Sequence, residues 1–293
     1  MSKISIESIQ KLREMSGVGM MDCRKALEET NGNIEEALQV LRKKGASVAA
    51  KRAENATENG IVEGISHENF SSLIEISCET DFSARTDAMR NFAKQVATAA
   101  ASDVDLSNMA NLMAAKTHDS NLTVQQSLDD LISKICESIK VSKAVSFKSD
   151  EFSTSNIYVH ADNSVASMVQ VRSDEKLSND QKSGLKDVLK EISMQVAVTN
   201  PLAINSNEID PKLIEKEVEL AKDQLSKTTK PASMWDMIIQ GKLERYYKDV
   251  CLLNQKFIKD DSISVQERIT KAAKELGIKN LTLVKFARIG IKR

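Results

Sequence analysis

Apolar residues recur at helical spacing through the first 45 residues, and glycines interrupt the pattern twice. The spacing predicts three short helices, the first ending at 16–19 and the second running over 20–30. Asn33 is expected to cap the third helix, and Gly45 to end it, because glycine readily adopts the left-handed conformation found after helices. Residues 46–59 lose the apolar stripe, which predicts a charged linker that is helical in part.

The middle of the chain changes to short apolar segments separated by polar turns. Such segments favour strands, and the first two flank His67-Glu68-Asn69, which predicts a β-hairpin. A helix is expected from about Thr86, whereas residues 102–120 are polar, weakly patterned and predict no element. The expected strands are 60–65, 70–76, 141–147, 155–160 and 164–171, with a helix over 124–139.

The C-terminal part returns to helical spacing. Asp210 and Pro211 are suited to begin a helix, with Asp as the cap and Pro at the first helical position. Apolar residues then recur from Ile214 to Leu225 at spacings of 4, 3 and 4, which is typical of a coiled-coil seam. This narrow stripe predicts a protruding two-helix hairpin. Further helices are expected at 180–198, 235–249 and 265–276, and a last strand at 281–289.

These patterns predict an α+β protein that is mainly helical. The first module, with its glycine-containing loop after the first helix, resembles a ubiquitin-associated (UBA) domain. Two α+β core subdomains with small antiparallel sheets, an inserted helical coiled-coil hairpin and a C-terminal helix are expected to follow. The expected boundaries are 1–54 for the UBA-like module with its linker, 55–140 for the first core subdomain, 141–180 and 232–263 for the second, 181–231 for the hairpin and 264–293 for the C-terminal module.

Composition narrows the class of protein. The 293 residues include 41 basic and 42 acidic side chains, and a net charge of -1 provides no general attraction to nucleic acid or membrane. The four cysteines form no C-x-x-C pair, which argues against a zinc site or disulfide framework and for a reducing compartment. The N-terminus has no apolar run like a signal peptide, so we expect a cytoplasmic protein.

The motifs of common catalytic sites are missing from the sequence. There is no phosphate-binding G-x-x-x-x-G-K-[ST] loop and no G-x-S-x-G motif. His67, His118 and His160 are isolated and lack metal-ligand spacing. We therefore expect no catalytic residues, no metal and no cofactor, and interpret the chain as a binding protein of several modules.

The connection between a predicted strand and a predicted helix consists of Thr80, Asp81, Phe82 and Ser83. Thr80, Asp81 and Ser83 can all cap a helix or close a turn, but Phe82 is an aromatic residue in a polar setting. One interpretation is a staple that folds back onto its own helix. The other is an anchor presented to the pocket of a partner. The four residues alone do not decide between them.

Two stretches resemble the bacterial translation elongation factor Ts family. Residues 11–45 (KLREMSGVGMMDCRKALEETNGNIEEALQVLRKKG) look like its N-terminal module, and residues 75–93 (EISCETDFSARTDAMRNFA) contain its Thr-Asp-Phe motif. The order of the later elements also agrees, so the resemblance covers essentially the full length. It implies a non-catalytic protein that binds the GTPase elongation factor Tu in its GDP form and promotes exchange of GDP for GTP.

The resemblance also implies roles for individual residues. Asp81 and Phe82 would enter the partner's nucleotide-binding domain near its magnesium site, and Thr80 and Ser83 would frame the turn. Ser83 departs from the valine usual in the family. Arg13, Val18, Gly19 and Met20, in the loop of the first module, would touch the same domain. A further, weaker candidate is His160 in the second core unit, where Ala-Asp-Asn replaces the expected glycine-rich turn.

A different class of function is a UBA-like adaptor that binds ubiquitin-like or nascent-chain partners. Only the first 45 residues favour it, and it leaves residues 75–93 unexplained. The sequence leaves open whether the chain forms a homodimer.

Overall fold

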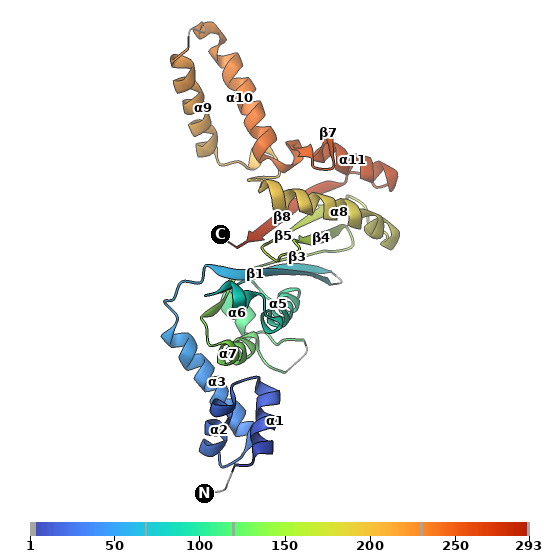
Figure 1. Cartoon of the computed structure of the whole chain (residues 1–293). Helices are drawn as coiled ribbons and strands as arrows, with labels where there is room; N and C mark the ends of the chain where they lie inside the picture. The colour runs from blue at the N-terminus through green and yellow to red at the C-terminus, as the bar shows by residue number, and fades with distance from the viewer. Residues whose placement is uncertain (1–3, 68, 119–120, 229–230, 292–293) are drawn as a thin grey trace. The chain divides into compact units, whose positions relative to one another are not determined.

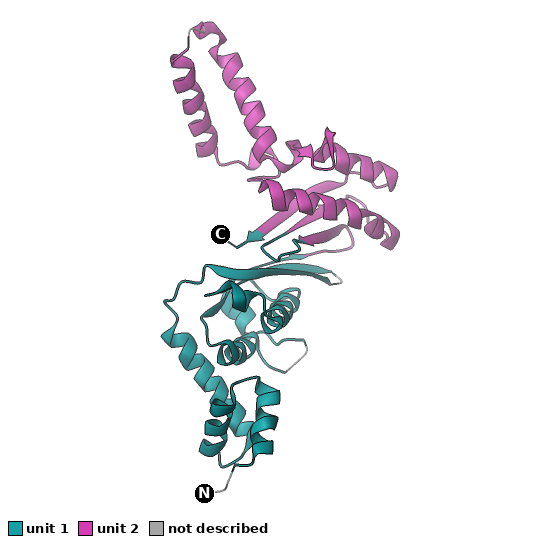
Figure 2. Ribbon diagram, in the orientation of Figure 1, with its two compact units in different colours: residues 1–147, 159–166, 289–293 teal, residues 148–158, 167–288 magenta. Residues whose placement is uncertain are grey.

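The computed structural model describes residues 4–67, 69–118, 121–228 and 231–291. It is an α+β protein (Figure 1), as the sequence predicts. The chain groups into two compact units (Figure 2). Unit 1 comprises residues 1–147, 159–166 and 289–293, and unit 2 comprises residues 148–158 and 167–288.

Unit 1 begins with the three predicted helices: α1 (Ile6–Ser16), α2 (Met20–Glu29) and α3 (Ile34–Lys51). Gly17 follows α1 with φ of 67°, and the Asn33 side chain caps α3 by accepting from two backbone N–H groups. The three helices enclose a small apolar core of their own. Its buried residues are Ile9, Leu12, Val18, Cys23, Ala26, Leu27, Ala37 and Leu41.

Helix α3 does not end at Gly45, contrary to the sequence-based prediction. It continues to Lys51 and packs against α7 (Val124–Ile135). A Cβ atom at Gly45 would clash with the Asp129 carbonyl oxygen and the Ser133 Oγ. Glycine is therefore needed here for the close approach of two helices rather than for a helix end.

The rest of unit 1 is a three-stranded sheet covered by helices (Figure 1). The predicted hairpin is confirmed: β1 pairs antiparallel with β2, with Ile61 opposite Ile76. Helix α5 packs against β1 and β2, and α7 packs against α5, so that the buried faces of both helices belong to one apolar core. The elements are β1 (Asn59–His67), β2 (Phe70–Cys78), α4 (Asp81–Ala84), α5 (Asp87–Ala100), α6 (Met109–Ala114), α7 and β3 (Ile139–Lys148). Helix α6 lies in the stretch for which the sequence pattern predicts no element.

Unit 2 has one main core. Buried Leu185 and Ile192 of α8 and buried Val265 and Ile269 of α11 belong to the same apolar cluster. Strands β4, β5 and β8 form a sheet in that order, and β6 pairs antiparallel with β7. The elements are β4 (Ser153–Val159), β5 (Val165–Arg172), α8 (Asn179–Thr199), β6 (Lys256–Phe257), β7 (Asp260–Ser264), α11 (Val265–Glu275) and β8 (Thr282–Gly290).

The helical hairpin consists of α9 (Pro211–Ser226) and α10 (Trp235–Val250) (Figure 1). Its helices share a separate small cluster built on Ala221, Leu225 and Ile239. Helix α8, which the expected boundaries assign to the hairpin, contributes to the main core of unit 2. Helix α11, expected in a separate C-terminal module, shares that core. Short 3-10 helices cover Ser206–Glu208, Ala232–Met234 and Leu252–Asn254.

Among the described residues, no helix has both the length and the apolar character required to cross a membrane.

Candidate functional site

The corner between β2 and α5 is built from two successive helix caps. Thr80 has an extended backbone, and its side chain accepts a hydrogen bond from the Ser83 amide at 3.3 Å, which starts the one-turn helix α4. Thr86 Oγ1 then donates to the Ser83 carbonyl at 2.8 Å and accepts from the Met89 amide at 3.2 Å, which starts α5. Capping oxygens of this kind satisfy the free amides of a first helical turn. The chain therefore turns sharply twice within a few residues.

Side chains of this corner separate into an inner and an outer pair. Ser83 and Ala84 are buried, with 6% and 5% of their surface exposed. Phe82, by contrast, is 81% exposed. Asp81 also faces outward and pairs with Arg85 at 3.1 Å on the surface of α4. The staple interpretation of Phe82 is therefore wrong, because the ring does not pack onto its own helix.

Two glutamates fix the backbone behind the corner. The Glu137 carboxylate accepts from the Thr80 amide at 3.1 Å and from Thr80 Oγ1 at 2.8 Å. Glu79 accepts from the Ser138 amide at 2.6 Å and from Arg52 Nη1 at 2.9 Å. The Ser138 amide first, and Arg52 second, hold the pKa of Glu79 below its ordinary value. Sequence reasoning missed both glutamates, because Glu137 lies 57 residues from Thr80 along the chain.

Cys78 lies directly under the corner and is fully buried. Its Sγ donates to the Thr80 carbonyl at 3.1 Å. Burial, and after it the nearby Glu137 carboxylate, raises the pKa of this thiol to about 11. Since the thiolate is the reactive form, Cys78 is an inert part of the support at neutral pH.

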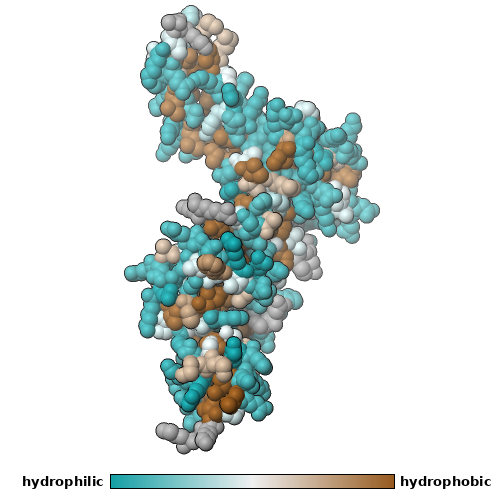
Figure 3. Space-filling model, viewed as in Figure 1, coloured by the Kyte–Doolittle hydropathy of each residue, from teal (hydrophilic) through white to brown (hydrophobic). Residues whose placement is uncertain are grey.

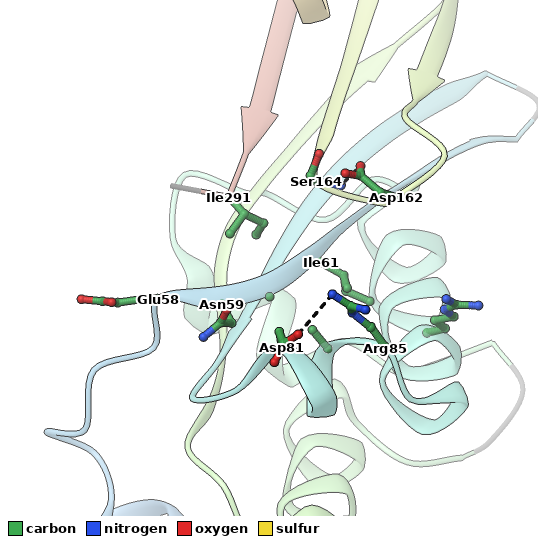
Figure 4. A pocket seen from close by; sticks show the side chains of 11 residues that line it. Glu58, Asn59, Ile61, Asp81, Arg85, Asp162, Ser164 and Ile291 are labelled. Atoms are coloured by element: carbon green, nitrogen blue, oxygen red, sulfur yellow. Dashed lines mark hydrogen bonds and ion pairs between the residues drawn. The ribbon is translucent and has the colours of Figure 1, made fainter. Parts of the chain in front are cut away.

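A hollow of about 760 Å³ opens beside α4 within unit 1. Figure 4 shows Asp81 and Arg85 on one side and Asp162, Ser164 and Ile291 on the other. The charged lining residues are of both signs, which suits a partner surface with both charges rather than a single small ion. The complete lining is Glu58, Asn59, Gly60, Ile61, Asp81, Ala84, Arg85, Arg90, Asp162, Ser164 and Ile291.

His160 stands at the edge of the turn that supplies two of these lining residues. It is exposed, and its carbonyl accepts from the Asn163 amide at 2.9 Å. Asn163 has φ of 53°, a left-handed conformation that glycine would adopt more easily. Asn163 also exchanges two hydrogen bonds with the backbone of Val62 on β1, which fixes the turn. His160 itself does not line the hollow.

The candidates in the N-terminal helices are not equivalent. Arg13 lies in the last turn of α1 rather than in the loop, which corrects its expected position, and it is exposed. Gly19 caps α2, and beyond its two chain neighbours no described atom lies within 4 Å of where its Cβ would be. Met20 is 44% exposed, whereas the Val18 side chain is buried in the helical core. The Val18 side chain therefore does not face a partner, and its backbone amide and carbonyl are bonded to Ser16 Oγ and Cys23 Sγ at 3.2 and 3.5 Å.

The same helices expose further apolar side chains. Ile6, Met15 and Met21 are 72%, 56% and 64% exposed. Figure 3 shows apolar atoms at the surface of this N-terminal part of the chain. Exposed methionines make adaptable contact surfaces. The sequence signal for them is only that Met15 and Met21 flank the glycine loop.

The exposed Phe82 side chain, on a corner whose backbone is held by Glu137, indicates a protein that binds a partner. Comparisons with known proteins identify the family. A family model described as Elongation factor TS matches residues 79–292. Elongation factor Ts of Lawsonia intracellularis is 32% identical over 290 residues, covering 98% of both chains. Elongation factor Ts of Clostridium perfringens (strain SM101) is 36% identical over 287 residues, covering 97% of this chain and 92% of the relative. That of Chloroherpeton thalassium is 34% identical and covers 94% of both chains.

The chain therefore belongs to the elongation factor Ts family, and the predicted resemblance is confirmed. Membership assigns it to protein biosynthesis, at the elongation stage of translation. The matched region of the family model begins one residue before Thr80 and includes the whole corner.

Proposed function

We propose that this chain is a non-catalytic guanine-nucleotide exchange factor that binds elongation factor Tu in its GDP form and promotes replacement of GDP by GTP. Family membership supports the setting in translation elongation. The observation that carries the exchange step is the 81% exposure of Phe82 on a corner whose backbone is fixed from behind. Such a side chain can enter a partner without first leaving a core of its own.

The target of the corner is the magnesium and phosphate site of the partner. In a GTPase the magnesium ion bridges nucleotide oxygens and protein, so moving its ligands weakens the hold on the nucleotide. Phe82 would displace the elements that carry these ligands, and the neighbouring Asp81 carboxylate would bring a negative charge near the cation. Thr80 and Ser83 frame the turn without facing outward.

One aromatic side chain is not enough to loosen a tightly bound nucleotide. Full burial of Phe82 would contribute about 1.5–3 kcal/mol, and each tenfold change in affinity needs about 1.4 kcal/mol. A broader interface must supply the remainder. Arg13, Gly19 and Met20 of the N-terminal helices offer a second contact surface, and His160 offers a weaker third one.

Binding of this chain and binding of GDP to the partner are coupled, and the coupling is reciprocal. If the chain weakens GDP binding by a given factor, GDP must weaken binding of the chain by the same factor. We further propose that the partner is bound in the cytoplasm, without nucleic acid or a membrane.

A nucleotide-release assay tests this function. Elongation factor Tu is loaded with a fluorescent GDP analogue, mixed with this chain and excess unlabelled GDP, and followed by stopped flow. We expect the release rate to rise with the concentration of the chain and to saturate. In size-exclusion chromatography the chain should co-elute with nucleotide-free elongation factor Tu, and added GDP should separate the two. An unchanged release rate together with separate elution would refute the proposal.

A further inference from the structure

Glu79 and Glu137 form a reciprocal clasp between two distant segments of unit 1. Glu79 follows strand β2 and binds the Ser138 amide, at 2.6 Å. Glu137 precedes strand β3 and binds the Thr80 amide, at 3.1 Å. Each carboxylate therefore accepts from the backbone of the other segment. We call Glu79, Thr80, Glu137 and Ser138 the carboxylate clasp.

The corner depends on the clasp because α4 has little stability of its own. It contains only four residues, and a single helical turn is unfavourable in isolation. Asp81 and Phe82 face outward and so gain little from the core. Thr80, the residue that caps α4, therefore sets the direction in which Asp81 and Phe82 point.

Glu137 binds both the backbone amide and the side-chain hydroxyl of Thr80. One carboxylate oxygen accepts a hydrogen bond from the Thr80 amide. The other accepts one from the Thr80 hydroxyl at 2.8 Å. The same hydroxyl oxygen accepts from the Ser83 amide at 3.3 Å and thereby caps α4. Hydrogen bonds to a charged acceptor are stronger than those between neutral groups. The path from Glu137 through Thr80 to Ser83 thus fixes the start of the helix that carries Phe82.

We propose that Glu137 is a positioning residue for nucleotide exchange, which holds Thr80 so that Asp81 and Phe82 meet the partner in one fixed orientation. This inference rests on the function proposed above. Glu137 does not touch the partner's nucleotide site; it acts through the corner. Its loss should therefore lower the rate at which bound GDP leaves the complex more than it lowers the affinity for the partner, to which other surfaces contribute.

The test uses Glu137→Ala and Glu137→Gln in the full chain. In the nucleotide-release assay we expect Glu137→Ala to lower the limiting rate at saturating chain by about tenfold or more, the scale on which displaced contact groups lose rate. The concentration for half-saturation should change by less than about twofold, because the other surfaces remain. Glu137→Gln keeps one acceptor oxygen for the Thr80 amide, so its rate should lie between wild type and Glu137→Ala.

A matched control distinguishes positioning of the corner from the general loss of a carboxylate that accepts from the backbone. Asp105 also accepts from one backbone amide and one hydroxyl, both of Ser107 and both at 2.9 Å, on a loop before α6. Asp105→Ala should leave the limiting rate unchanged. A double variant should show no additivity: with Phe82→Ala already present, Glu137→Ala should lower the rate by little more.

The possible outcomes distinguish this inference from the proposed function. No acceleration by the wild-type chain refutes the proposed function itself. Acceleration by wild type with an equal limiting rate for Glu137→Ala overturns the positioning role, as does a full additional loss in the Phe82→Ala background. If Glu137→Ala has lost the near-UV circular dichroism of the native chain, the folded Glu137→Gln decides: a limiting rate equal to that of wild type overturns the role, and a lower one supports it.

Discussion

Phe82 and Ser83 are neighbours in the chain with opposite environments: the phenylalanine is 81% exposed and the serine 6%. The reversal of the usual preference follows from the backbone. Thr80 begins a one-turn helix whose inner side must face the core, and Ser83 and Ala84 occupy that side. Asp81 and Phe82 are left on the outer side. Ser83 is therefore buried, and we expect it to support the corner rather than to contact a partner.

Gly45 offers a test of the packing between the N-terminal helices and the rest of unit 1. Gly45→Ala places a Cβ against the Asp129 carbonyl oxygen, so α3 and α7 must move apart. We expect a loss of about 1–3 kcal/mol from such overpacking, which exceeds the gain of about 0.5–1 kcal/mol from replacing a helical glycine. Differential scanning calorimetry should show a lower Tm.

Gly241→Ala is the matched control for that substitution. Gly241 also lies within a helix, α10, but beyond its chain neighbours and the backbone of that helix no described atom lies within 4 Å of where its Cβ would be. Only the helix-propensity gain remains, so we expect stabilisation of the hairpin by about 0.5–1 kcal/mol. A higher Tm for Gly45→Ala than for wild type would show that α3 and α7 do not approach as closely as described.

Because of the carboxylate clasp, the stability of unit 1 should decrease at acid pH. The pKa of Glu79 is lowered in the folded chain, mainly by the Ser138 amide and then by Arg52. Because its pKa is lowered on folding, the ionised Glu79 carboxylate stabilises the fold at pH values above its ordinary pKa of 4.5. This contribution disappears as the pH falls through the pKa of the folded state. Glu79→Gln should therefore have a lower Tm than wild type near neutral pH, and the difference should shrink below 4.5. A constant difference in Tm across this range would contradict the interpretation.

The rest of the chain should fold without the hairpin if the deletion removes only residues of the hairpin's own apolar cluster. Replacing residues 215–244 by a short Gly-Ser linker removes the whole cluster around Ala221 and Ile239 and leaves the main core of unit 2 intact. We expect a cooperative thermal transition for the remaining chain, and a smaller loss of GDP release than replacement of Phe82 causes. A deletion of residues 200–230 also removes buried Ile204 from the main core and should be clearly less stable. Thermal collapse of the shorter deletion would show that the hairpin supports the core.

Local sequence signals predicted most of the secondary structure. Asn33 and Asp210 cap helices as expected, and Gly277, with φ of 64°, follows α11. These features depend on neighbouring residues alone. The errors concern packing between distant segments: Gly45 resembles a helix end, but its role depends on Asp129 of another helix.

The same distinction explains which parts of the candidate site could be predicted. The Thr80–Ser83 corner was visible as a strand-to-helix change with a misplaced aromatic residue. The exposure of Phe82 was not, since the same residues suit a staple. Glu137 carried no signal, because the apolar pattern places it inside an expected helix, 124–139, whereas α7 ends at Ile135, and its partner Thr80 is far away in the sequence. The burial of Val18 depends on the helical core around it and was likewise hidden.

The central claim is that the outward pair of the corner opens the nucleotide site of elongation factor Tu. The most direct measurement is stopped-flow release of fluorescent GDP with Phe82→Ala and Asp81→Ala, with Met237→Ala, a similarly exposed hairpin side chain at 66%, as control. Both corner side chains are exposed, so all three variants should keep the wild-type Tm within about 1–2 °C, as surface substitutions usually do. We expect Phe82→Ala and Asp81→Ala to slow GDP release about tenfold or more, and Met237→Ala to match wild type. Wild-type release rates in both corner variants would contradict the account.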